Sequence, residues 1–128
     1  MASRKIISNK GGDYPPTVKI TAAPGVSFVG KYLAIRDGIK TQYGPKAVYQ
    51  FAIQDTTAPI VRRAQNGGFV EVNVNVGDTV EIFSPPSVLD GMLRQVVVGE
   101  TVKIVYTGLA PKKPGKNPAY LFDVEVIA

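Results

Sequence analysis

The residues best suited to chemistry in this chain are lysines and tyrosines, because histidine and cysteine are both absent. Without those two types, the usual general acids and bases, thiol nucleophiles and zinc ligands are missing. The ten Asp and Glu residues are scattered and form no calcium-loop motif. We therefore expect a protein that is not an enzyme and that needs no metal or cofactor.

A Lys-rich loop is predicted at residues 108–118, which contain three prolines, two glycines and no acidic residue. Proline and glycine end the flanking strands and keep this segment out of a core. The sequence thus predicts a basic hairpin tip with Tyr106 and Tyr120 near its base, and a merely solvated loop is the alternative. The lysines of this loop are Lys112, Lys113 and Lys116.

A second loop is predicted at residues 37–45, with turn residues at both ends. It presents Lys40 and Tyr43, and it is flanked by Arg36 and Lys46. Lysines contact a phosphate backbone without reading sequence, and tyrosines stack on bases at about 1–3 kcal/mol each. Tyr43 is the best stacking candidate because a tyrosine in a loop has no core to fill.

Three other tyrosines, Tyr49, Tyr106 and Tyr120, have two interpretations. Their rings suit base stacking, but each shares a strand face with a residue expected in the core. Packing at the end of a barrel is therefore an equal alternative for them. The neighbouring core candidates are Phe51, Ile104 and Phe122.

The charge balance favours a polyanionic partner. Fifteen Lys and Arg against ten Asp and Glu give a net charge of +5. A basic field attracts nucleic acid, although many small proteins are basic for solubility alone. Arg62 and Arg63 are further candidates for the rim of a binding face.

Alternating apolar residues predict an all-β chain with one short helix at 87–96. Leu33 is expected in the core, whereas Tyr32 cannot be assigned because Gly30 indicates a bulge. Residues 1–16 are expected to form a flexible basic arm, and residues 17–128 a single domain. Strands are expected at 17–21, 26–36, 46–55, 60–63, 69–76, 79–83, 101–107 and 119–127.

One helix cannot cover a large open sheet, whereas closure into a small barrel plugged by the helix removes its edges. A helix between the third and fourth strands predicts an OB-fold, a five-stranded Greek-key barrel. The additional strand segments predict an extra hairpin or an elongated third strand. In this fold the ligand crosses strands 2 and 3, between the two basic loops.

Several segments resemble the OB-fold single-stranded DNA-binding proteins of bacteriophages. They are Gly30–Leu33, Tyr49–Phe51, the helix Val88–Leu93, the segment Val98–Gly108 and the closing segment Tyr120–Val126. The resemblance implies sequence-independent binding of single-stranded DNA in phage replication or recombination. It also implies a location in the cytoplasm of the host cell.

Two other functions are compatible with these residues, an RNA-binding OB protein and an OB-type module that binds protein. Unlike bacterial replication single-strand binders, the sequence ends without an acidic tail, so recruitment of partners by such a tail is not expected. No membrane contact is expected either. Exposed strand edges would allow a homodimer or cooperative self-association on DNA, but no residue demands it.

Overall fold

The computed structural model describes residues 15–42, 44–111, 114–115 and 118–128. Most of the predicted arm at 1–16 lies outside these ranges. Four predicted binding residues, Tyr43, Lys112, Lys113 and Lys116, lie outside them as well.

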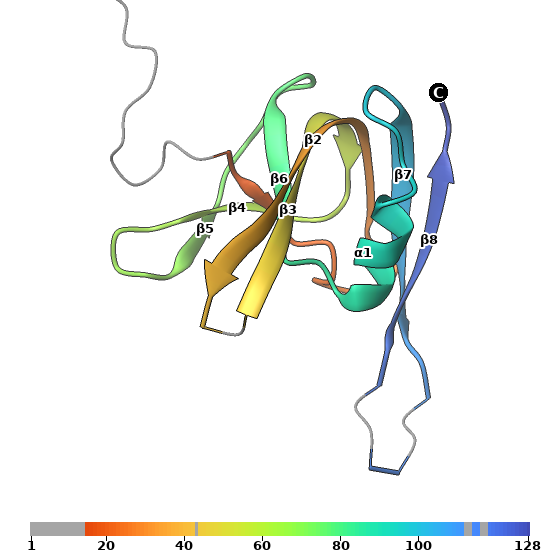
Figure 1. Cartoon of the computed structure of the whole chain (residues 1–128). Helices are drawn as coiled ribbons and strands as arrows, with labels where there is room; N and C mark the ends of the chain where they lie inside the picture. The colour runs from red at the N-terminus through yellow and green to blue at the C-terminus, as the bar shows by residue number, and fades with distance from the viewer. Residues whose placement is uncertain (1–14, 43, 112–113, 116–117) are drawn as a thin grey trace, which may run out of the picture.

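The described residues form one curled sheet of eight strands with a single short helix (Figure 1). Along the sheet the order is β5-β4-β1-β6-β3-β2-β7-β8, and every pair is antiparallel except β1 with β6. The predicted all-β class with one helix is confirmed. The elements are β1 (Thr17–Val18), β2 (Ser27–Thr41), β3 (Gly44–Thr56), β4 (Ile60–Arg63), β5 (Phe69–Glu71), β6 (Thr79–Phe83), α1 (Ser87–Leu93), β7 (Thr101–Leu109) and β8 (Tyr120–Val126).

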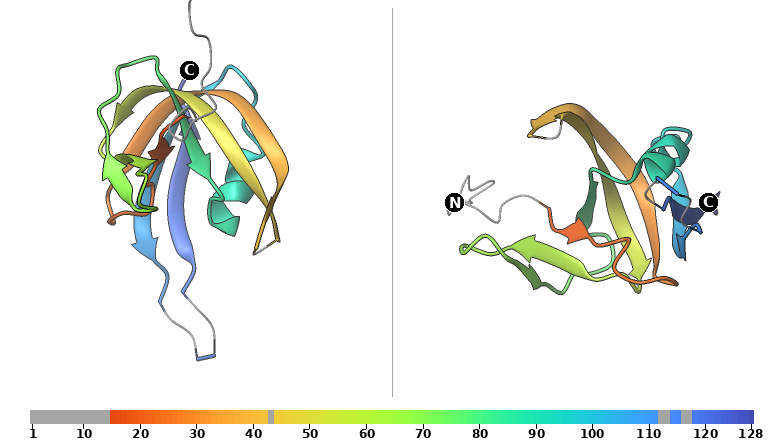
Figure 2. Two further views of the ribbon diagram at one scale, coloured as in Figure 1. Left: turned by 90° about the vertical axis from the view of Figure 1, so that its left-hand side faces the viewer. Right: turned by 90° about the horizontal axis from the view of Figure 1, so that it is seen from below.

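Bulges in the long β2–β3 pair bend the sheet. The pairing register shifts after Val29, after Tyr32 and after Arg36, and each such irregularity increases local twist. Gly30 lies at the first shift, where a Cβ atom would stand 2.7 Å from the Phe28 ring. The bend brings β1, β4 and β5 to one side of the molecule and α1, β7 and β8 to the other (Figure 2, view from below).

The core lies on the concave side of this bend. Phe28 and Phe51 meet edge to face with ring centroids 5.4 Å apart, and Tyr32 packs on Phe51 at 5.7 Å. The helix α1 contributes Leu89 and Leu93, which are fully buried in the same cluster. The described residues thus share one apolar core.

The bulges also correct one core prediction. Leu33 is 37% exposed, whereas Tyr32 is buried. The register shift between Tyr32 and Ala34 leaves Leu33 outside the ladder of paired residues, so its side chain is not directed into the core. Alternation along the sequence could not locate that extra residue.

Several predicted boundaries were wrong. The expected loop at 37–45 is mostly strand, since β2 runs to Thr41 and β3 begins at Gly44. The expected strand at 69–76 ends at Glu71, because β4 pairs with only three residues of it. The helix ends at Leu93, where the amides of Gln95 and Val96 turn back to carbonyls three residues earlier.

Ser87 and Asp90, which have the spacing of a capping-box variant, do not cap the start of α1. Pro86 occupies the N-cap position, and no side chain caps the helix. Asp90 instead accepts hydrogen bonds from Tyr49 and Arg94. No helix in the described part of the chain is long and apolar enough to cross a membrane.

Candidate functional site

A groove of about 620 Å³ lies on the face of the sheet opposite the core. Strand pairing explains its lining, because alternate residues of each strand point to the same face. Thr17 of β1 pairs with Val61 of β4 and with Glu81 of β6, and Arg63 of β4 pairs with Phe69 of β5. We call this surface the groove, and its main lining residues are Lys19, Val61, Arg63, Phe69, Glu81 and Phe83.

Two phenylalanine rings stand in the groove with about half of their surface in solvent. Phe69 is 51% exposed and Phe83 is 47% exposed. Two cations also lie close to the Phe69 ring, with Lys19 Nζ at 4.2 Å and Arg63 Cζ at 5.4 Å from its centroid. Such cation–π contacts hold an aromatic ring and positive charge together at one point of the surface.

The floor of the groove contains one buried carboxylate. Glu81 Oε2 accepts hydrogen bonds from Arg36 Nη2 and from Gln50 Nε2, both at 2.9 Å. The Arg36 contact is also an ion pair, in which Glu81 is buried and Arg36 is half exposed. This pair therefore compensates the buried charge and fixes Arg36 beside the groove.

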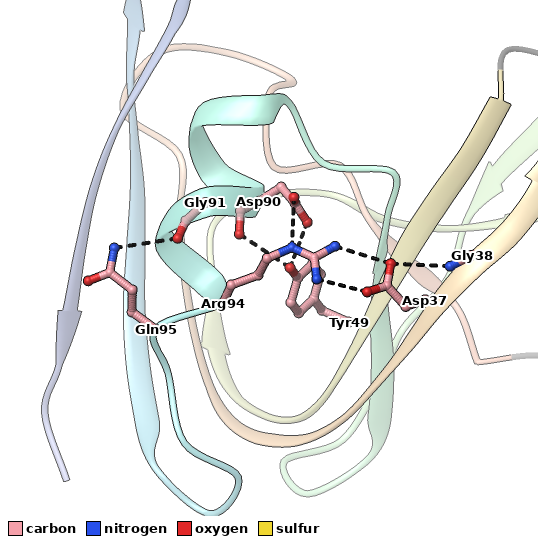
Figure 3. Close-up of polar contacts among 7 residues, drawn as sticks. All are labelled: Asp37, Gly38, Tyr49, Asp90, Gly91, Arg94 and Gln95. Atoms are coloured by element: carbon pink, nitrogen blue, oxygen red, sulfur yellow. Dashed lines mark hydrogen bonds and ion pairs between the residues drawn. The ribbon is translucent and has the colours of Figure 1, made fainter.

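A second polar cluster joins α1 to the β2–β3 pair (Figure 3). Arg94, the residue that follows α1, donates two hydrogen bonds to the Asp37 carboxylate, at 2.8 and 3.1 Å. Arg94 Nε also donates to Asp90 at 3.0 Å, and the Tyr49 hydroxyl donates to Asp90 Oδ1 at 2.6 Å. The helix thus braces the hairpin that carries Arg36.

The same contacts shift the pKa values of Asp37 and Tyr49. Hydrogen bonds from Arg94 lower the pKa of Asp37 below its usual range. Burial, together with the Asp90 carboxylate, raises the pKa of the Tyr49 hydroxyl far above its usual value. Tyr49 is therefore a neutral donor that holds the helix to β3.

The structure resolves the alternatives for two of the predicted tyrosines. Tyr49 is fully buried and Tyr106 is nearly so, and both rings therefore pack in the core. Tyr120 is 41% exposed and rests on Tyr106, with ring centroids 5.9 Å apart. Of the three, Tyr120 therefore has a ring surface that a base can reach.

The predicted cations fall into two described groups. Arg62 and Arg63 line the groove, and Arg36 reaches its floor through Glu81. Lys40 and Lys46 lie near the end of the β2–β3 hairpin, opposite Pro45 and Ile39 respectively.

Tyr120 belongs to the β7–β8 hairpin, on the other side of the molecule from β4 and β5 (Figure 2).

Three groove residues, Lys19, Phe69 and Phe83, were missed in the sequence. In β6, Val80 and Ile82 point into the core. Phe83 therefore lies on the opposite face of the strand, together with the polar residues Thr79 and Glu81. An aromatic ring on the polar face of a strand was the available signal. Phe69 was hidden because the neighbouring valines dominate the alternation of that segment.

Comparison of the chain with protein-family models, curated protein sequences and solved structures finds no match. Among the described residues, no group of three or more carboxylates could hold a metal ion. What this chain does must therefore be inferred from its own groove.

Proposed function

We propose that this protein binds single-stranded DNA, largely independently of sequence, in phage replication or recombination. The observation that supports it best is the groove, where the half-exposed rings of Phe69 and Phe83 lie beside Lys19 and Arg63. Aromatic platforms with cations that track the backbone are the shared feature of single-strand binders. A duplex hides the faces of its bases, so these rings favour an unpaired strand.

We also propose that the fold is a variant of the OB-fold. The pairings β2–β3, β3–β6, β2–β7 and β7–β8, with α1 between β6 and β7, agree with the connectivity of its five strands. On this correspondence, β1, β4 and β5 are additions beside β6. OB-folds bind across their second and third strands, here β3 and β6, and the outer side of β6 lines the groove.

The β2–β3 hairpin extends the proposed site, and the β7–β8 hairpin is a separate candidate contact on the other side of the molecule from β4 and β5 (Figure 2). Lys40 and Lys46 on β2–β3 add charge near one end of it. Tyr120 offers a third exposed ring at the base of the β7–β8 hairpin. Lys112, Lys113 and Lys116 remain predicted phosphate contacts of that hairpin.

Fluorescence anisotropy with a labelled single strand of mixed sequence tests this function, with a duplex of equal length as the control. We expect tight binding to the single strand that weakens steeply with salt, because released counterions drive phosphate contacts. An RNA strand of the same sequence in a parallel titration decides between DNA and RNA. A protein that binds no nucleic acid at low salt would contradict the proposal and favour the protein-binding module.

A triple variant, Lys112→Ala, Lys113→Ala and Lys116→Ala, tests the loop separately. We expect weaker binding and a shallower dependence on salt, since each phosphate contact contributes to the salt slope. If the wild type shows salt-dependent binding and the variant binds equally well, the loop does not contact the strand and the groove alone remains as the proposed site.

A further inference from the structure

We propose that Glu81 gives one position of the groove a preference for bases that carry an exocyclic amino group. The inference rests on the proposed function and adds base discrimination to it. Glu81 is an unexpected residue in the lining of a groove that binds phosphates, because a carboxylate repels the negative charge of the ligand. Such a group needs a reason to line the groove.

One oxygen of Glu81 is engaged and the other is open. Both hydrogen bonds to its carboxylate end on Oε2, from Arg36 and Gln50, and within the described residues Oε1 accepts none. Every fully buried side-chain nitrogen or oxygen in this part of the chain has a partner. Oε1 must therefore touch solvent, and the solvent beside Glu81 occupies the groove that this residue lines.

The two donors fix the orientation of the carboxylate. Arg36 and Gln50 bind the same oxygen at 2.9 Å, from β2 and β3 respectively. Glu81 itself is only 5% exposed, so its side chain has little freedom to turn away. Oε1 is thus a positioned acceptor on which a ligand donor can replace solvent.

A stacked base can supply that donor. Phe83 is two residues from Glu81 on the same strand face, about 7 Å along β6, a distance close to the width of a base. A base stacked on Phe83 would thus place one edge near Oε1. Cytosine offers an amino group at its C4 position, whereas thymine offers a carbonyl oxygen there, which a carboxylate repels.

The test compares single strands of equal length made of cytosine, thymine or 2-pyrimidinone, a cytosine analogue without the 4-amino group. Homopolymers present the same base in every register, so the position bound by Glu81 is always occupied. We expect the cytosine strand to bind about fivefold more tightly than the other two, as one polar base contact allows. Equal affinity for all three would overturn the inference while the proposed function stands.

The variant Glu81→Gln assigns the preference to this residue. Its amide keeps an oxygen for Arg36 and Gln50 but can present an amino group to the thymine carbonyl, so the cytosine-to-thymine ratio should fall to about one. Glu125→Gln on β8 makes the same charge change away from the groove and should keep the wild-type ratio. A ratio unchanged in Glu81→Gln would overturn the role of Glu81.

The ratio is the readout because removing an acid can raise affinity for every strand. Thermal unfolding of each variant shows whether it folds, and the three wild-type titrations decide the preference even if Glu81→Gln does not fold. Failure of the wild type to bind any strand would overturn the proposed function together with the inference.

Discussion

At the scale of single residues, Phe69 is the side chain on which the proposed binding depends most. Its ring is half exposed, and Lys19 and Arg63 lie close to it. We expect Phe69→Ala to weaken single-strand binding about tenfold, because one stacking platform is lost. Val76→Ala is a matched control, since Val76 is exposed and does not line the groove. Equal losses in both variants would contradict the role of Phe69.

Tyr49 belongs to the core, so we expect it to contribute to stability and not to strand binding. Tyr49→Phe removes the hydroxyl that donates to Asp90 at 2.6 Å. We expect the free energy of unfolding to fall by about 1 kcal/mol, with single-strand affinity unchanged. Urea denaturation and anisotropy measure the two quantities. Lower affinity at unchanged stability would indicate that Tyr49 meets the ligand.

Asp37 supplies a prediction for pH dependence. Arg94 lowers its pKa in the folded state, so this contact stabilises the fold at pH values above the pKa of Asp37 in the unfolded chain. The stabilisation is lost as the pH falls through that value toward the lower, folded pKa. The carboxyl titration of Asp37 measured by NMR should show a depressed pKa.

Removing the donor should reverse that shift. In Arg94→Met, the pKa of Asp37 should return toward its ordinary value, because the two hydrogen bonds from Arg94 are gone. Lys103→Met removes the same charge on β7 and should leave the Asp37 titration as in the wild type. An Asp37 pKa that is equal in all three proteins would show that the ion pair does not form in solution.

At the scale of elements, the β2–β3 pair shapes both the core and the groove, and Gly30 permits its first bend. We expect Gly30→Ala to lower the free energy of unfolding by about 1–3 kcal/mol, because its Cβ would lie 2.7 Å from the Phe28 ring. Gly91→Ala in α1 meets nothing within 4 Å and should stabilise the helix by up to about 1 kcal/mol. Thermal or urea unfolding measures both variants, and a stable Gly30→Ala would contradict the packing described for Phe28.

Elements with strong local patterns could be predicted from the sequence, and those that depend on distant partners could not. Alternation located β3, β6, β7 and β8 because each has a clear apolar face. The bulge at Leu33 depends on how β2 pairs with β3, and the end of β5 depends on the length of β4. No local pattern contains those pairings.

At the scale of the whole molecule, the same limit applies to the candidate site. Arg36, Arg62 and Arg63 could be proposed from charge alone. They are grouped with Phe69 and Phe83 because β1 lies between β4 and β6, pairing antiparallel with β4 and parallel with β6. That contact connects segments far apart in the sequence, so only the folded chain assembles the groove.

The most direct test of the central claim is an NMR titration of the labelled protein with a single strand. We predict that the largest amide shifts fall on the groove, at Lys19, Arg63, Phe69 and Phe83, and that the exposed residues Val97 and Val98, which do not line the groove, stay unshifted. Shifts that avoid β4, β5 and β6, or a spectrum that the strand leaves unchanged, would contradict single-strand binding in the groove.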